Sequence, residues 1–190
     1  MSWLLISLLV AVSLAACNSG QNADSGNEAD SKAEGTLAKA IQNGSITVGF
    51  ANEKPYAYKD ANGELTGEAV EIARVILQRL GIHEMKGELT EFGSLIAGLQ
   101  ANRFDLITAG MFVNPERCEA VLFANPEYSI GEAIAVKKGN PLGLGSYEDI
   151  ANNEKARVAV MTGAVEIGYL QKSGVPDERI IQVPDQASAI

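Results

Sequence analysis

Apolar residues recur with two different spacings in the first part of the chain, and the pattern predicts strands that alternate with helices. Residues 45–50 alternate polar with β-branched or aromatic positions, as strands do. Residues 68–80 carry apolar side chains at helical spacing, with acidic residues early and basic residues late, which the helix dipole favours. Residues 106–109 form a short apolar run typical of a buried strand.

Three further elements complete this alternation. Residues 36–44 have the pattern of a short amphipathic helix, residues 85–90 that of a second strand, and residues 95–102 that of another helix. The resulting order of strand, helix, strand, helix, strand is typical of a mostly parallel sheet. We therefore predict an α/β fold in which the loops at the carboxyl ends of the strands are available for ligand binding.

The second part of the chain repeats the α/β pattern. Residues 129–138 are rich in β-forming residues, and we expect an extended strand that leads out of the first α/β layer. The pattern then predicts a helix at 147–151 capped by Ser146, a strand at 157–161, a helix at 165–172 and a strand at 179–183. Asp185 would cap a further helix that the sequence carries for about one turn, so we expect this second part to be incomplete.

An arginine stands at a predicted helix start just after the strand 106–109. Asn114 is a suitable N-cap, Pro115 occupies the first helical position, and Arg117 follows. A guanidinium at the carboxyl end of a strand can bind a carboxylate through two parallel hydrogen bonds. The alternative is that Arg117 is a solvated charge on a helix surface.

Polar and aromatic residues also follow the other two predicted strands. Glu53 and Tyr56 come after the first strand, Phe92 comes after the second, and Gly110 and Phe112 lie between the third strand and Arg117. Because parallel strands end at the same sheet edge, we expect these residues to converge. The alternatives are a solvated loop charge for Glu53, a partly exposed loop aromatic for Tyr56, and simple helix packing for Phe92.

Composition narrows the classes of function. The 190 residues include 24 acidic and 15 basic side chains, a net charge of -9, which argues against nucleic-acid binding. The only histidine, His83, is expected on a surface loop, and Cys118 is expected to pack within its helix. No cofactor and no metal site are predicted. Because the sequence shows no nucleophile–base pair and no phosphate-binding loop, an enzyme is not predicted.

The amino terminus has the features of an export signal. Residues 1–16 contain only apolar residues and serines, although an export signal normally also carries a Lys or Arg. The run Leu14-Ala15-Ala16-Cys17 resembles the lipobox of bacterial lipoproteins, in which the peptide is cut before the cysteine and the cysteine is lipidated. Residues 18–35 contain no large apolar residue and are expected to form a flexible tether. We therefore predict a signal peptide over residues 1–17 and an exported, lipid-anchored protein.

Five segments together resemble the amino-acid-type solute-binding proteins of bacterial ABC importers. They are Gly67-Glu68, Phe92–Ile96, Arg103–Asp105, Pro115–Arg117 and Phe123–Tyr128. Within that family, residues 49–58, 90–96 and 109–118 are most similar to the ectoine- and hydroxyectoine-binding proteins. The resemblance extends from about Ser45 to the end of the chain.

This resemblance implies a two-lobe, periplasmic-binding-protein-like (type II) α/β fold with a mostly parallel sheet in each lobe. The first lobe would span residues 36–133, a hinge strand residues 134–138, and an incomplete second lobe residues 139–190. It also implies a ligand site. Tyr56, Phe92 and Phe112 would be aromatic walls around a ligand cation, a contact that contributes up to about 2 kcal/mol per ring when desolvated.

The remaining site residues follow from the same resemblance. Glu53 would face the ring nitrogens of the ligand, and Arg117 would bind its carboxylate. The backbone at Gly110 and Phe112 would add hydrogen bonds. Thr162 and Gly163, expected at a helix N-terminus, would bind the carboxylate from the second lobe. The alternative for Thr162 is an ordinary N-cap.

The function implied is capture of ectoine or hydroxyectoine outside the cell by a monomer, for delivery to an ABC permease. A rival hypothesis is a receptor for a polar amino acid, in which Glu53 meets the α-amino group. Two other classes stay open: a dehydratase-type enzyme on the same fold, and an extracytoplasmic sensor lobe.

Overall fold

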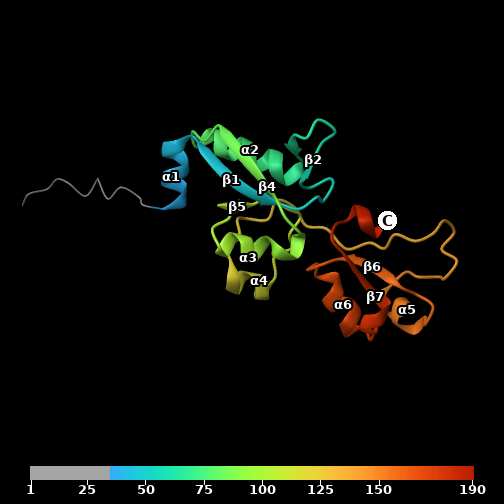
Figure 1. Cartoon of the computed structure of the whole chain (residues 1–190). Helices are drawn as coiled ribbons and strands as arrows, with labels where there is room; N and C mark the ends of the chain where they lie inside the picture. Colours follow the sequence, from blue (N-terminus) through green and yellow to red (C-terminus); the bar gives the residue numbers. More distant parts are fainter. Residues whose placement is uncertain (1–34) are drawn as a thin grey trace, which may run out of the picture. The chain divides into compact units, whose positions relative to one another are not determined.

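The computed structural model describes residues 35–190 (Figure 1). The predicted signal peptide, the lipidation of Cys17 and the tether up to residue 34 lie outside the described residues. Among those described, no helix is long and apolar enough to cross a bilayer.

A three-stranded parallel sheet forms the first half of the described chain. Its strands are β1 (Ser45–Phe50), β4 (Glu84–Leu89) and β5 (Leu106–Ile107), in the order β4-β1-β5. Ser45 lies opposite Glu84, and Val48 lies opposite Leu106. The predicted parallel α/β arrangement is confirmed, and the three strand ends meet at one edge.

Helices cover both faces of this sheet (Figure 1). The elements beside it are α1 (Thr36–Asn43), α2 (Glu68–Arg79), the 3-10 turn η1 (Phe92–Ser94), α3 (Leu95–Gln100), α4 (Pro115–Ala120) and the small antiparallel pair β2 (Tyr58–Lys59) and β3 (Leu65–Thr66). Val48 on β1 shares a core with Leu77 of α2, whereas Ala51 packs with Leu95 of α3. Alternate residues of a strand face opposite sides, so each face acquires its own core.

Two glycines make room for one aromatic ring on the α3 side. Phe104 is buried, and its ring fills the space where side chains at Gly49 and Gly98 would lie. A Cβ atom on Gly98 would stand 2.6 Å from Phe104 Cζ. The close fit brings α3, and with it Phe92, against the sheet.

A second, two-stranded parallel sheet forms the rest. It comprises β6 (Val158–Met161), β7 (Ile180–Val183), α5 (Tyr147–Asn152), α6 (Glu166–Lys172) and the 3-10 turns η2 (Asp177–Arg179) and η3 (Ala187–Ala189). Its core is formed by Ile150, Ala156, Val160, Leu170, Val175 and Ile180. Arg179 donates to the carbonyls of Ile150 and Ala151, both at 2.9 Å, and of Asn153 at 2.6 Å. These bonds satisfy carbonyls that the end of α5 leaves without helical partners.

Three local predictions were wrong. Residues 129–138, including the hinge strand expected at 134–138, form no strand, because no other described segment pairs with them. Cys118 is exposed, because the six-residue helix α4 buries none of its residues. Thr162 does not lie at a helix N-terminus, because α6 begins at Glu166 and Val165 holds the cap position, and the N-cap alternative fails for the same reason.

Candidate functional site

Arg117 is held in place by its own helix start. The Asn114 side chain accepts a hydrogen bond from the Arg117 backbone N–H at 2.8 Å, and Pro115 is the first helical residue. This confirms the predicted N-cap. The Arg117 Nη1 donates to the Phe112 carbonyl at 2.8 Å, and Nη2 donates to the Gly163 carbonyl at 3.0 Å. The guanidinium is therefore a fixed, partly buried group that retains further N–H donors.

Phe92 lies directly beneath this guanidinium. The Arg117 Cζ stands 5.6 Å from the centre of the Phe92 ring, which is a cation–π contact. The ring is also 4% exposed and packs with Leu95 and Phe104. Phe92 therefore packs in the core, which is the alternative considered from the sequence, and it also supports the arginine, a role that the sequence did not predict.

Glu53 is a buried carboxylate with one strong hydrogen bond. Glu53 is 6% exposed, and its Oε2 accepts a hydrogen bond from the Gly110 N–H at 2.9 Å. Its backbone pairs with Ala57 in both directions, at 2.8 and 3.0 Å, which fixes the loop. Burial raises the pKa of Glu53 to about 7, because the hydrogen bond from Gly110 and the charge of Arg117 only partly offset the loss of hydration.

Tyr56 stacks on a residue that sequence reasoning did not assign to the site. Its ring lies 5.7 Å from that of Tyr128, with 14° between the planes. Gly110 allows this packing, since a Cβ there would stand 2.8 Å from Tyr56 Cδ2 and 3.0 Å from Glu53 Oε1. Burial raises the pKa of Tyr128, and the neighbouring Tyr56 and Glu68 add to the shift. The only sequence signal for Tyr128 was its place in the segment Phe123–Tyr128, which carries part of the family resemblance.

The turn after β6 contributes backbone groups. Thr162 is tied to the sheet, because its Oγ1 and its N–H donate to the Val183 carbonyl at 3.2 and 2.9 Å. Gly163 has a positive φ of 82° and presents its carbonyl to Arg117. The Gly163 N–H has no acceptor among residues 35–190, so it is available to a ligand oxygen.

A second acidic residue near the site was also missed. Glu166, the first residue of α6, is partly buried, and its charge acts on both Glu53 and Arg117. Burial lowers the pKa of Arg117 and the nearby carboxylates, Glu166 foremost, oppose that shift, so the guanidinium keeps its charge at neutral pH. A helix-start glutamate gives no sequence signal of such a role.

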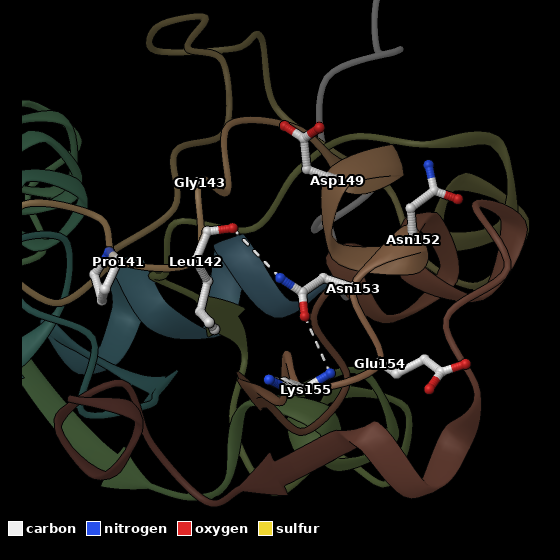
Figure 2. A pocket seen from close by; sticks show the side chains of 8 residues that line it. All are labelled: Pro141, Leu142, Gly143, Asp149, Asn152, Asn153, Glu154 and Lys155. Carbon is white, nitrogen blue, oxygen red and sulfur yellow. Dashed lines mark hydrogen bonds between the residues drawn. The ribbon is translucent and has the colours of Figure 1, made fainter.

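One further hollow in the molecule contains none of these residues. Figure 2 shows a shallow pocket of about 660 Å³ beside α5, lined in part by Leu142, Asp149, Asn153 and Lys155. The Asn153 amide donates to the Leu142 carbonyl at 3.3 Å and accepts from the Lys155 N–H at 3.1 Å. Both polar groups of the Asn153 amide are therefore engaged within the wall of this pocket. Within the described part of the chain, no cluster of three metal-ligating side chains occurs.

The site therefore offers one fixed cation, one buried carboxylate and several aromatic rings. Comparison with known proteins identifies the family of the chain. Residues 46–179, more than half of the chain, match the family "Bacterial extracellular solute-binding proteins, family 3". The chain belongs to this family.

Individual relatives agree with that assignment. The chain is 46% identical over 157 residues to the "Probable amino-acid ABC transporter periplasmic-binding protein y4tE" of Sinorhizobium fredii, covering 82% of this chain and 52% of that protein. It is also similar to the crystal structure of EhuB in complex with hydroxyectoine, with a TM-score of 0.72, 40% identity, and coverage of 81% of this chain and 60% of that one.

A third similar structure is a binding protein that is related to an enzyme. The ancestral amino acid-binding protein AncCDT-1, a precursor of cyclohexadienyl dehydratase, matches with a TM-score of 0.73 and 29% identity over 82% of this chain and 67% of that one. These likenesses confirm the periplasmic-binding-protein-like α/β fold. The chain spans about half the length of the y4tE protein.

Proposed function

We propose that this protein is an extracytoplasmic receptor that captures a small zwitterionic solute of the ectoine class for uptake by an ABC importer. One observation carries the proposal. The short turn from Gly110 to Phe112 binds both charged groups of the site, since the Gly110 N–H donates to Glu53 and the Phe112 carbonyl accepts from Arg117. A carboxylate and a guanidinium held by one turn suit a ligand that carries both charges.

The roles of the side chains follow from this arrangement. Arg117 and the Gly163 N–H bind the ligand carboxylate, and Glu53 binds the ligand cation. Tyr56 and Phe112 supply aromatic surface, although one face of Tyr56 is stacked on Tyr128. The buried Phe92 acts through the Arg117 guanidinium that lies over its ring. Thr162 acts by holding the 162–163 turn, because its hydroxyl is engaged with Val183. The similarity to EhuB, solved with hydroxyectoine, supports a cyclic ligand of this class.

A polar amino acid is the second candidate, with its α-amino group on Glu53. The similarity to the y4tE protein, named for amino-acid transport, favours it. The partly buried Glu166 adds a second negative charge, which suits a ligand with more than one cationic group. A dehydratase on this fold is the third reading, because the similar AncCDT-1 is a precursor of cyclohexadienyl dehydratase. Turnover of a candidate cyclohexadienyl substrate by the purified protein tests it.

The arrangement of the whole protein is part of the same proposal. Residues 36–133 form the first lobe, residues 134–138 the connection, and residues 139–190 belong to the second lobe. Export through the signal peptide, anchoring by a lipid on Cys17, a monomeric state and delivery to a permease complete it. The family description "extracellular" supports export.

Calorimetric titration of the purified protein tests the ligand. Ectoine, hydroxyectoine, glutamine and arginine are titrated separately, and preferential binding of the first two supports the ectoine class. Binding of an amino acid alone would replace ectoine by the second candidate and keep the role of Arg117. Binding of none of the four would overturn the proposal.

Replacement of Arg117 by alanine tests the central role in that proposal. The variant leaves a desolvated ligand carboxylate unpaired, so we expect a loss of roughly 3–5 kcal/mol in binding free energy. Arg157→Ala is the matched control, because Arg157 is exposed. Nearly unchanged affinity of Arg117→Ala by calorimetry would refute the role given to this residue.

A further inference from the structure

Two backbone segments that are 70 residues apart approach each other closely beside Arg117. Gly93, in η1, faces the turn at Thr162 and Gly163 that follows β6. A Cβ on Gly163 would stand 2.5 Å from the Gly93 Cα, and a Cβ on Gly93 would stand 3.2 Å from the Thr162 carbonyl oxygen. Neither segment leaves room for a side chain on the other.

This approach determines where the Gly163 carbonyl lies. Phe92, the neighbour of Gly93, supports the Arg117 guanidinium from one side at 5.6 Å, and the Gly163 carbonyl accepts from Arg117 Nη2 at 3.0 Å. The guanidinium is therefore held between an aromatic ring from one segment and a carbonyl from the other. If the two segments moved apart, the hydrogen bond from Arg117 to Gly163 would lengthen first. Arg117 and Phe92 would stay in contact, because both belong to the first half of the described chain.

We propose that Gly93 is a positioning residue of the ligand site: its missing side chain lets the 162–163 turn come close enough to bind Arg117, and so lets the two lobes close over a solute. The proposal rests on the function proposed above for the ligand, but the contact itself exists without a ligand. Any side chain at position 93 meets backbone atoms of Thr162 and Gly163, which cannot rotate away as a flexible side chain can.

Gly93 is a cleaner position to change than Gly163. Gly163 has a φ of 82°, so a side chain there is strained whatever the space, whereas Gly93 has no positive φ. Alanine at position 93 requires its neighbours to move by a few tenths of an ångström, and valine requires more because two methyl groups branch from the same Cβ. Gly131→Val is the matched control, since a Cβ on Gly131 has no neighbour within 4 Å.

The closure is measured without ligand by the distance between two spin labels. The labels are attached to cysteines introduced as Lys86→Cys and Lys172→Cys, both at exposed positions, with the native thiols removed as Cys17→Ser and Cys118→Ser. Double electron–electron resonance then gives the distance distribution for the parent, Gly93→Ala, Gly93→Val and Gly131→Val. Urea unfolding of each variant shows that it is folded.

We expect the mean label distance to increase in the order parent, Gly93→Ala, Gly93→Val, with Gly131→Val equal to the parent. Affinity for the solute that the parent binds is expected to fall about tenfold or more in Gly93→Val, because a hydrogen bond to a charged group is lost. An unchanged distance distribution in folded Gly93→Val overturns the inference. If the parent binds none of the tested solutes, the ligand proposal fails. The label distances alone then test the role of Gly93.

Discussion

Glu53 is predicted to make the free protein less stable as the pH rises, and a single isosteric substitution isolates the effect. Its folded-state pKa is about 7, against an ordinary value of 4.5. Between these values the folded protein binds one proton more than the unfolded chain. Stability therefore falls by about 1.4 kcal/mol per pH unit, about 3 kcal/mol in all, and the stabilisation present below pH 4.5 is lost as the pH rises through 7.

Glu53→Gln removes this titration while it keeps an oxygen that can accept from the Gly110 N–H. We expect the difference in unfolding free energy between Glu53→Gln and the parent to be constant below pH 4.5. It should then grow in favour of the variant up to about pH 7 and level off above it. Urea unfolding followed by circular dichroism from pH 4 to 8.5 measures both proteins, and the subtraction cancels the carboxylates that they share.

The same titration should act on ligand binding with the opposite sign. A ligand cation binds the ionised carboxylate, so affinity should fall about tenfold per pH unit below pH 7 in the parent and stay level in Glu53→Gln. A stability difference that is independent of pH between 5 and 7.5 would refute the reasoning about burial. A pH-dependent stability with a pH-independent affinity would instead separate Glu53 from the ligand.

Two further predictions concern the scaffold that positions the site. Gly98→Ala places a methyl group 2.6 Å from the Phe104 ring and should destabilise the protein by about 1–3 kcal/mol. Gly168→Ala, in open space on α6, should stabilise the protein by about 0.5–1 kcal/mol. Equal urea midpoints for the two variants would contradict the packing argument. Arg179→Met removes the donors to the carbonyls at the end of α5 and should cost about 2 kcal/mol or more, against little change for the exposed Arg157→Met. A thermal unfolding temperature of Arg179→Met equal to that of Arg157→Met would show that water replaces those bonds.

The elements that the sequence predicted correctly depend on contacts between near neighbours. The N-cap of Asn114 on Arg117 spans three residues, and β1 was predicted at the residues it occupies, 45–50, because its alternation is a local property. The order of these elements was enough to predict a parallel sheet and to bring its strand ends to one edge. Their positions after the predicted strands identified Glu53 and Arg117 as candidate binding residues, and the family resemblance then assigned each its role toward a ligand.

What only the tertiary structure decided is which distant groups share the same space. The stacking of Tyr128 on Tyr56, the influence of Glu166 on Glu53, and the contact of Gly93 with Gly163 each join residues at least 70 positions apart. The missing strand at 129–138 has the same origin, because strand formation needs a partner that the segment's own composition cannot provide. Local propensity determines what a segment is able to form, whereas the burial and the charge of a side chain depend on neighbours that only the folded chain supplies.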